Sequence, residues 1–231
     1  MAYLGDELRD SQPGDGVSSL RFAFHADLLL ASSWDCHVRL YDARLGTCRV
    51  AFKQRVPVLD AAFVDTEAAV SGGLSGSVRL HHFQSTLEEV REAEREQRAH
   101  HSRLSPGQVV GKHEQPVKCV EHNTANGLVL SGSWDASLRL WDIRAPEGPG
   151  RAVGTLPLPG KVYSMATSDT RLVVATAGRR IQVYDLRSLR AAAPPLQQRE
   201  SPLKFQARRQ HAITGQVGAD ACADPMPAML A

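Results

Sequence analysis

The sequence has little excess charge of either sign and no long hydrophobic run. Its 27 lysines and arginines nearly balance 25 aspartates and glutamates, which leaves a net charge of +2. A dedicated nucleic-acid-binding domain instead concentrates basic residues on one face. No apolar run approaches the roughly 18 residues that predict a membrane-spanning helix, and residues 1–10 lack the apolar core of a secretory signal. We therefore expect neither a nucleic acid nor a membrane as a direct partner.

Closely spaced cysteines are also missing. The four cysteines are Cys36, Cys48, Cys119 and Cys222, and none lies in a C-x-x-C pair. That spacing is typical of zinc sites and redox motifs. We expect small buried thiols in a reducing compartment instead of disulfides or metal ligands.

The motifs that accompany catalysis are absent as well. There is no G-x-S-x-G and no H-E-x-x-H. Residues 154–161 resemble a phosphate-binding loop, but two prolines lie between the glycines and Val162 replaces the required Ser or Thr. Adjacent histidines such as His81 and His82 point to opposite faces of a strand, so they do not easily share an ion. The sequence predicts a non-catalytic protein with no cofactor and no metal site.

The most informative feature that is present is a repeat. Four stretches pass from a short turn into a strand-like run, and these runs end at Asp42, His82, Asp142 and Asp185. The separations are 40, 60 and 43 residues, and two of them match the period of roughly 40–45 residues typical of WD repeats. The middle one is a period plus an insertion. Because each WD repeat builds one four-stranded blade, the sequence predicts an all-β fold, a WD-repeat β-propeller.

The third repeat is the most complete of the four. It predicts strands at residues 117–122, 128–130 and 138–141, and its Asn126-Gly127 pair is typical of a tight turn. Four residues match the buried tetrad of the WD-repeat family: His113, Ser131, Asp135 and Trp141. The resemblance implies that the aspartate orients the histidine ring, the serine bridges, and the tryptophan supplies an N–H. Such a network stabilises a fold only when every member is satisfied.

The other three repeats keep less of this pattern. Ala31 stands at the serine position of the first repeat, and the second has Ser75 in its turn and His81 at its aromatic position. The fourth repeat has Gly178 in its turn. Such erosion is ordinary in propellers, so it concerns individual blades and leaves the predicted fold unchanged.

Breaks in the repeat divide the chain into predicted segments. These are an N-terminal segment (1–12), blades one and two (13–82), a charged insertion (83–110), blades three and four with the start of the next (111–208), and a disordered tail (209–231). Within the insertion, residues 86–101 offer opposite-charge pairs at helical spacing without a wide apolar face. That pattern predicts a solvated helix or a disordered loop, with a partner-binding helix as the alternative.

The length predicts an incomplete ring. Without the insertion and the tail, 180 residues remain, and roughly 40 residues per blade gives about four to four and a half blades. Most WD propellers have about seven, and an open arc exposes sheet edges and apolar flanks. The sequence therefore indicates either a shortened product (an alternative transcript, a faulty gene model or a decayed copy) or a propeller completed by another chain.

A more specific resemblance covers about residues 16–208, interrupted by 83–110. The segments that carry it come in order at 20–22, 32–35, 58–63, 71–74, 116–121, 131–135, 161–164, 175–180 and 197–206. Together they closely resemble the WD-repeat mitotic checkpoint protein of the Bub family. The run 200–204 also occurs in the Rae-type mRNA-export WD proteins, but the segments at 32–35 and 178–180 favour the checkpoint family.

The resemblance implies a function. Members of the Bub family are non-catalytic scaffolds in which one propeller face grips the GLEBS motif, a short acidic peptide of checkpoint kinases. The complex then docks on a phosphorylated kinetochore scaffold. Further implied partners are ubiquitin and components of the anaphase-promoting complex, and the implied location is the nucleus and kinetochore, together with the cytoplasm. The alternatives are an mRNA-export adaptor at the nuclear pore and a truncated product with impaired function.

The resemblance also implies four peptide-binding residues. Arg208 matches a family arginine that clamps the peptide, Trp34 matches an exposed tryptophan of the binding face, and Trp134 is its counterpart in the third repeat. Lys204 is the fourth candidate. Arginine forms bidentate bonds with carboxylates, and an exposed aromatic ring supplies contact area. The competing interpretation is that both tryptophans only cap their blades.

Overall fold

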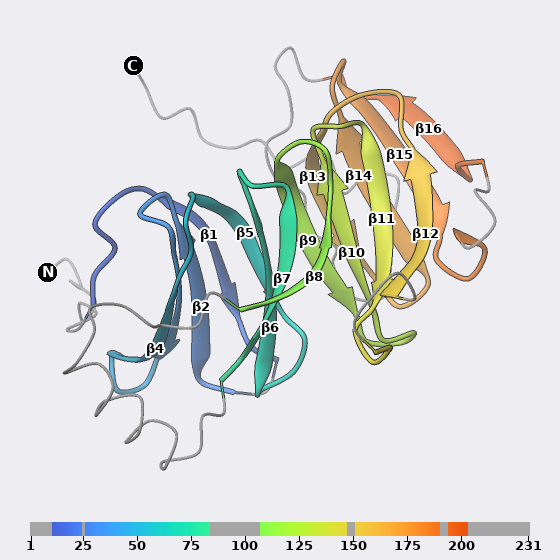
Figure 1. The fold of residues 1–231 in the computed structure, drawn as a ribbon. Helices are drawn as coiled ribbons and strands as arrows, with labels where there is room; N and C mark the ends of the chain where they lie inside the picture. Colours follow the sequence, from blue (N-terminus) through green and yellow to red (C-terminus); the bar gives the residue numbers. More distant parts are fainter. Residues whose placement is uncertain (1–10, 25, 84–106, 147–150, 190–193, 203–231) are drawn as a thin grey trace, which may run out of the picture.

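The computed structural model describes residues 11–24, 26–83, 107–146, 151–189 and 194–202. Within these ranges the chain forms four antiparallel sheets of four strands each, ordered β1-β2-β3-β4, β5-β6-β7-β8, β9-β10-β11-β12 and β13-β14-β15-β16. We call them blades one to four. Figure 1 shows them side by side in chain order, from blue to orange. The predicted all-β, WD-repeat propeller architecture is confirmed.

The strands are short, and most have six residues. Their bounds are β1 (Val17–Phe22), β2 (Leu28–Ser33), β3 (His37–Asp42), β4 (Thr47–Lys53), β5 (Val58–Phe63), β6 (Ala68–Gly73), β7 (Ser77–His82), β8 (Gln108–Lys112), β9 (Val117–Asn123), β10 (Leu128–Ser133), β11 (Ser137–Asp142), β12 (Ala152–Pro157), β13 (Val162–Thr167), β14 (Arg171–Thr176), β15 (Arg180–Asp185) and β16 (Gln197–Glu200).

The second strand of a blade has apolar residues on both faces because both faces are buried. Strand β10 is buried along its whole length. It lies between β9 and β11, Leu130 packs with residues of blade four, and Val129 packs with residues of blade two. In β11, Leu138 and Leu140 are buried at 0% and 1% exposure, whereas Arg139 between them is partly exposed. This alternation is that of a strand with one face in the core.

Successive blades stack by placing a valine on a small residue. The first strands β1, β5, β9 and β13 lie next to one another. Val117 at the start of β9 packs against Gly72 of blade two, and Val162 at the start of β13 packs against Gly132 of blade three. A Cβ on Gly132 would come within 2.6 Å of the Val162 side chain, so at this boundary the glycine permits a closer approach than a larger residue would.

An ionic link joins the first strands of three blades. Arg21 of β1 contacts Asp60 of β5 at 3.3 Å and Glu121 of β9 at 2.7 Å. Asp60 also accepts a hydrogen bond from the backbone N–H of Val120 at 3.0 Å. Burial opposes the charge of Arg21, but Asp60 and Glu121 outweigh it and raise the pKa of the guanidinium above its ordinary value. The link therefore fixes the relative position of blades one to three.

Blade boundaries differ from those that the sequence predicts. Residues 108–110 were assigned to the charged insertion, but they belong to β8, which pairs with β7 and completes blade two. Similarly, β16 completes blade four. The difference arises because the sequence repeat ends at the third strand of a blade, so the fourth strand falls in the next repeat. The helix expected at residues 86–101 lies outside the described residues.

The expectation that the cysteine thiols are buried is only partly correct. Cys119 is buried, whereas Cys36 and Cys48 are partly exposed. Cys36 lies in the β2–β3 turn at a positive φ of 70°, and Cys48 lies in β4, so neither position faces the core. Cys222 lies outside the described residues. Among the described residues, no helix is long and apolar enough to cross a membrane.

Candidate functional site

Four turns between the second and third strands of the blades lie at one end of the molecule, because the blades stack in the same orientation. Each turn begins with a backbone N–H that donates to the carbonyl just before the first strand of its blade. These donors and acceptors are Trp34 and Gly16, Leu74 and Pro57, Trp134 and Pro116, and Ala177 and Lys161, at 2.8–3.1 Å. We call the surface formed by Trp34, Leu74, Trp134 and Ala177 the turn face. Equivalent backbone bonds therefore place these four side chains at the same end of their blades.

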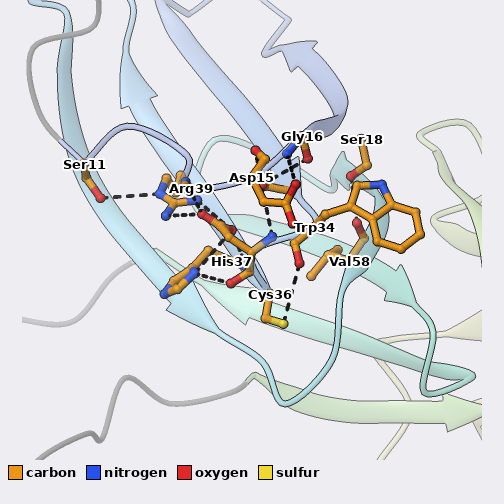
Figure 2. A network of polar contacts seen from close by, with 12 residues as sticks. Ser11, Asp15, Gly16, Ser18, Trp34, Cys36, His37, Arg39 and Val58 are labelled. Carbon is orange, nitrogen blue, oxygen red and sulfur yellow. Dashed lines mark hydrogen bonds and ion pairs between the residues drawn. The ribbon is translucent and has the colours of Figure 1, made fainter.

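Trp34 is the exposed aromatic of this face. It is 44% exposed, and Figure 2 shows its indole projecting away from the side chains of Arg39 and His37. The adjacent Asp35 holds the turn, because its carboxylate accepts from the Gly14 N–H at 2.9 Å and contacts Arg39 at 2.7 Å. Burial raises the pKa of Asp35, but the hydrogen bonds from Arg39 and Gly14 outweigh it and hold that pKa well below its ordinary value. The turn that presents Trp34 is thus braced by a carboxylate that stays charged.

Trp134 is more enclosed and has a cation above it. Lys161 Nζ lies 5.9 Å from the centre of the Trp134 ring, within the range of a cation–π contact. The indole nitrogen is buried and has no hydrogen-bond partner among the described residues. Lys161 itself is exposed. This part of the turn face therefore combines an aromatic surface with a positive charge.

The structure brings the four tetrad residues of blade three together beneath Trp134. His113 Nε2 lies 2.7 Å from Ser131 Oγ, and Trp141 Nε1 donates to the same hydroxyl at 2.7 Å. On the other side of the ring, His113 Nδ1 lies 3.0 Å from Asp135 Oδ2. The distances fit a neutral histidine that donates from Nδ1 to the carboxylate and accepts the Ser131 proton at Nε2. All four members are then satisfied.

Burial and the carboxylate act in opposite directions on His113. Burial lowers the pKa of the imidazole, Asp135 raises it, and the net effect is a lower pKa than usual. The pKa of Asp135 is also lowered, because hydrogen bonds from Ser137 and His113 outweigh the effect of its burial. The pair therefore holds a neutral ring against a charged carboxylate, and this positions the turn that carries Trp134.

Blade two has a network at the equivalent position that the sequence did not reveal. Gln54 Nε2 donates to Ser71 Oγ at 2.7 Å, and this hydroxyl lies 2.8 Å from His81 Nε2. Gln54 lies four residues before Val58, as His113 lies four residues before Val117. That spacing is the signal that could have found it. Burial lowers the pKa of His81 to about 3, so this ring is also neutral.

Blades one and four have other residues at the site of this hydrogen-bond network. In blade one, the hydroxyl of Tyr41 donates to the backbone carbonyl of Ser11 at 2.7 Å. In blade four, the corresponding residues are Leu158, Val174 and Tyr184, which join a hydrophobic cluster. Ala31 and Val174 therefore replace the bridging serine without leaving buried partners unpaired.

Of the predicted peptide-binding residues, the structure places Trp34 and Trp134 on the turn face. Lys204 and Arg208 lie outside the described residues. Lys161, which sequence reasoning passed over, joins Trp134 at this face. No group of three or more His, Cys, Asp or Glu side chains within the described ranges could hold a metal ion.

Comparison with known proteins agrees with the repeat architecture. The family described as WD domain, G-beta repeat matches residues 7–42 and 105–142. The second match starts with the strand that completes blade two and then covers the first three strands of blade three. This offset explains why repeat and blade boundaries differ. These matches show that the chain carries WD repeats.

The chain is also similar to mitotic checkpoint proteins. The chain is 40% identical over 205 residues to mitotic checkpoint protein BUB3.1 of Arabidopsis thaliana, which covers 88% of this chain and 54% of the relative. It is 32% identical to mitotic checkpoint protein bub3 of Dictyostelium discoideum, with 85% and 52% covered. The poly(A)+ RNA export protein of Schizosaccharomyces pombe is 30% identical, with 85% and 50% covered. The chain is thus similar to Bub3-type checkpoint proteins and to an RNA-export protein, and it spans about half the length of the curated relatives it matches.

Proposed function

We propose that this chain is a non-catalytic scaffold of the spindle assembly checkpoint. In this proposal the turn face binds GLEBS-type acidic peptides of checkpoint kinases and kinase-like proteins and docks them at kinetochores. The similarity to checkpoint proteins from a plant and a social amoeba supports the biological setting. The observation that carries the binding mode is the pair of tryptophans at equivalent points of one face, one exposed and one beneath Lys161.

The chemistry of the turn face suits an acidic peptide. An exposed indole such as Trp34 supplies a large apolar contact at little cost in conformational entropy. Lys161 supplies a positive charge to a carboxylate or a phosphate, and the Trp134 ring beneath it limits where that charge lies. Lys204 and Arg208 remain predicted contacts on the strength of the family resemblance, with Arg208 clamping a carboxylate.

The wider setting is part of the same proposal. The loaded scaffold would dock on phosphorylated repeats of a kinetochore scaffold, with ubiquitin or anaphase-promoting complex components as further partners. It would be found in the nucleus and at kinetochores, and also in the cytoplasm.

Affinity capture from mitotic extract tests this function. Immobilised chain should retain checkpoint kinases, and the Lys161→Glu variant should retain several-fold less because a reversed charge repels an acidic peptide. The matched control is Arg44→Glu, which makes the same charge change at an exposed turn at the opposite end of blade one. Equal retention by both variants, or no kinase in any sample, would contradict the proposal.

A second function has its own support. The similarity to poly(A)+ RNA export protein and to mRNA export factor GLE2 of Chaetomium thermophilum favours an adaptor at the nuclear pore. The same capture experiment separates the two. Nucleoporins in place of checkpoint kinases would indicate the export adaptor.

A further inference from the structure

Each internal blade boundary repeats one apolar contact. The second and third strands of a blade present four positions to the next blade, and in blade three these are Leu130, Gly132, Leu138 and Leu140, all buried. They pack with Val162 and Met165 of blade four in one hydrophobic cluster. Blade two presents Val70, Gly72, Val78 and Leu80 to Val117 and Val120 in the same way.

Blade four presents the same four positions at its outer side. They are Val173, Ala175, Ile181 and Val183, and the ladder pairs Val173 with Val183 and Ala175 with Ile181. Val173, Ile181 and Val183 are partly exposed, whereas their counterparts in blade three are 0–1% exposed, and the small Ala175 between them is 3% exposed. Within the described residues, no strand packs on this side of blade four. It is therefore a blade-stacking surface that no other described strand covers.

Blade one has the complementary surface. Val17 is 47% exposed and Leu20 is 46% exposed. At the internal boundaries the preceding blade covers both positions. The counterparts of Val17 are Val58, Val117 and Val162, each 0% exposed. The counterparts of Leu20 are Ala61, Val120 and Met165, which are 2%, 0% and 3% exposed. The difference in exposure is what removal of a preceding blade would produce.

We propose that blade four of one chain stacks on blade one of a second copy of the same chain. Val17 would then lie on Ala175 of the partner as Val117 lies on Gly72, so the contact continues the packing already used inside the molecule. Two copies joined at both ends form a twofold ring of eight blades, within the range of roughly four to eight blades that propellers adopt. A head-to-tail contact of this kind produces a closed ring when its rotation closes and a filament when it does not.

Light scattering coupled to size exclusion tests the pairing on purified residues 1–231. The wild-type chain should elute at twice the 25.1 kDa mass of one chain. Val17→Asp and Ile181→Asp should each weaken dimerisation by about tenfold or more, because a charge enters an apolar contact on either side of the boundary. Leu45→Asp is the matched control, because it adds the same charge at a position that is 66% exposed in the β3–β4 turn.

Mixing the two variants distinguishes a head-to-tail contact from other dimers. A mixture of Val17→Asp and Ile181→Asp chains contains one intact boundary, so dimers should form in the mixture at concentrations where each variant alone is monomeric. Each variant must show a cooperative thermal transition, and Val17→Thr, with nearly the same shape, is the substitute if Val17→Asp does not fold. A monomeric wild-type chain, an open-ended ladder of masses, or dimerisation that survives Ile181→Asp would overturn the proposal.

Discussion

Blades two and three fill the same buried position with different residues. Blade three uses a histidine, a serine and a tryptophan, and blade two uses Gln54, Ser71 and His81 in the same order and with the same bridging hydroxyl. The sizes of the packed residues also differ between the two blades: a large ring faces a glycine in one, and a smaller ring faces a phenylalanine in the other. Trp141 packs against Gly111 on the neighbouring blade, whereas the smaller His81 ring packs against Phe52 at 4.7 Å. Blades two and three therefore share the bridging hydroxyl and the filled volume, whereas the residue types around them vary.

The largest expected effect comes from removing the bridging hydroxyls. Ser131→Ala leaves His113 and Trp141 without their buried partner, and Ser71→Ala does the same to Gln54 and His81. We expect each to lower the free energy of unfolding by about 2–4 kcal/mol, because two buried polar groups lose a hydrogen bond. Urea unfolding followed by circular dichroism measures this. Ser188→Ala, at an exposed turn, should change stability by less than about 0.5 kcal/mol. A large loss in blade three alone would show that the two networks are not equivalent.

The packing of Trp141 against Gly111 gives the next prediction. A Cβ on Gly111 would meet the Trp141 ring, whereas a Cβ on Gly154 would lie 3.7 Å from Leu140 in ordinary contact. Gly111→Ala should therefore lower the free energy of unfolding by about 1–3 kcal/mol through overpacking, and Gly154→Ala should have little effect. Equal stability of the two variants in urea would mean that the ring and the missing side chain are not matched.

Removing the turn carboxylate sharpens the comparison, because blade two has Ser75 where blade three has Asp135. Asp135→Ala should cost about 1–3 kcal/mol, since the His113 N–H loses its buried acceptor. Thermal denaturation monitors the change. The variant should also alter the fluorescence of Trp134, which lies next to Asp135. An unchanged melting temperature would mean that the carboxylate adds nothing to the three-residue network.

The smallest expected effect is a dependence on pH. The pKa of His81 is lowered by burial from an ordinary 6.5 to about 3, so the unfolded chain binds a proton more readily than the folded chain. Its contribution to stability is fully present above about pH 6.5 and is lost as the pH falls toward 3. Between pH 7 and pH 5.5 this amounts to about 1 kcal/mol. The loss measured by urea unfolding should be smaller in His81→Gln, and an equal loss would assign the pH dependence to other groups.

The fold class could be predicted from the sequence because the turn and strand pattern that ends each repeat is local in sequence and recurs along the chain. Alternating Leu138 and Leu140 and the turn at Trp134 recur with a period of one blade, so the strands and their stacking follow from periodicity. The tetrad residues were accessible for the same reason, since blade three keeps every member of the family pattern.

The network of blade two, the end of blade two and the position of Lys161 could not be predicted, because they depend on contacts between residues far apart in sequence. Gln54 does not resemble the histidine that it replaces, and only its position four residues before Val58 relates the two. The boundary of blade two was missed because β8 follows a long interruption of the repeat. Lys161 was overlooked because the sequence does not show that its ammonium group lies above the Trp134 ring.

Calorimetric titration of residues 1–231 with a GLEBS-type acidic peptide tests the central claim most directly. The proposed function predicts saturable binding that weakens by about 10- to 30-fold in Trp34→Ala, as expected for an exposed aromatic at the centre of a contact. Leu45→Ala, at an exposed position of the β3–β4 turn, should bind as the wild-type chain does. Absence of heat in a sample with a cooperative thermal transition, or equal affinity of both variants, would contradict the assignment of the turn face as the peptide-binding surface.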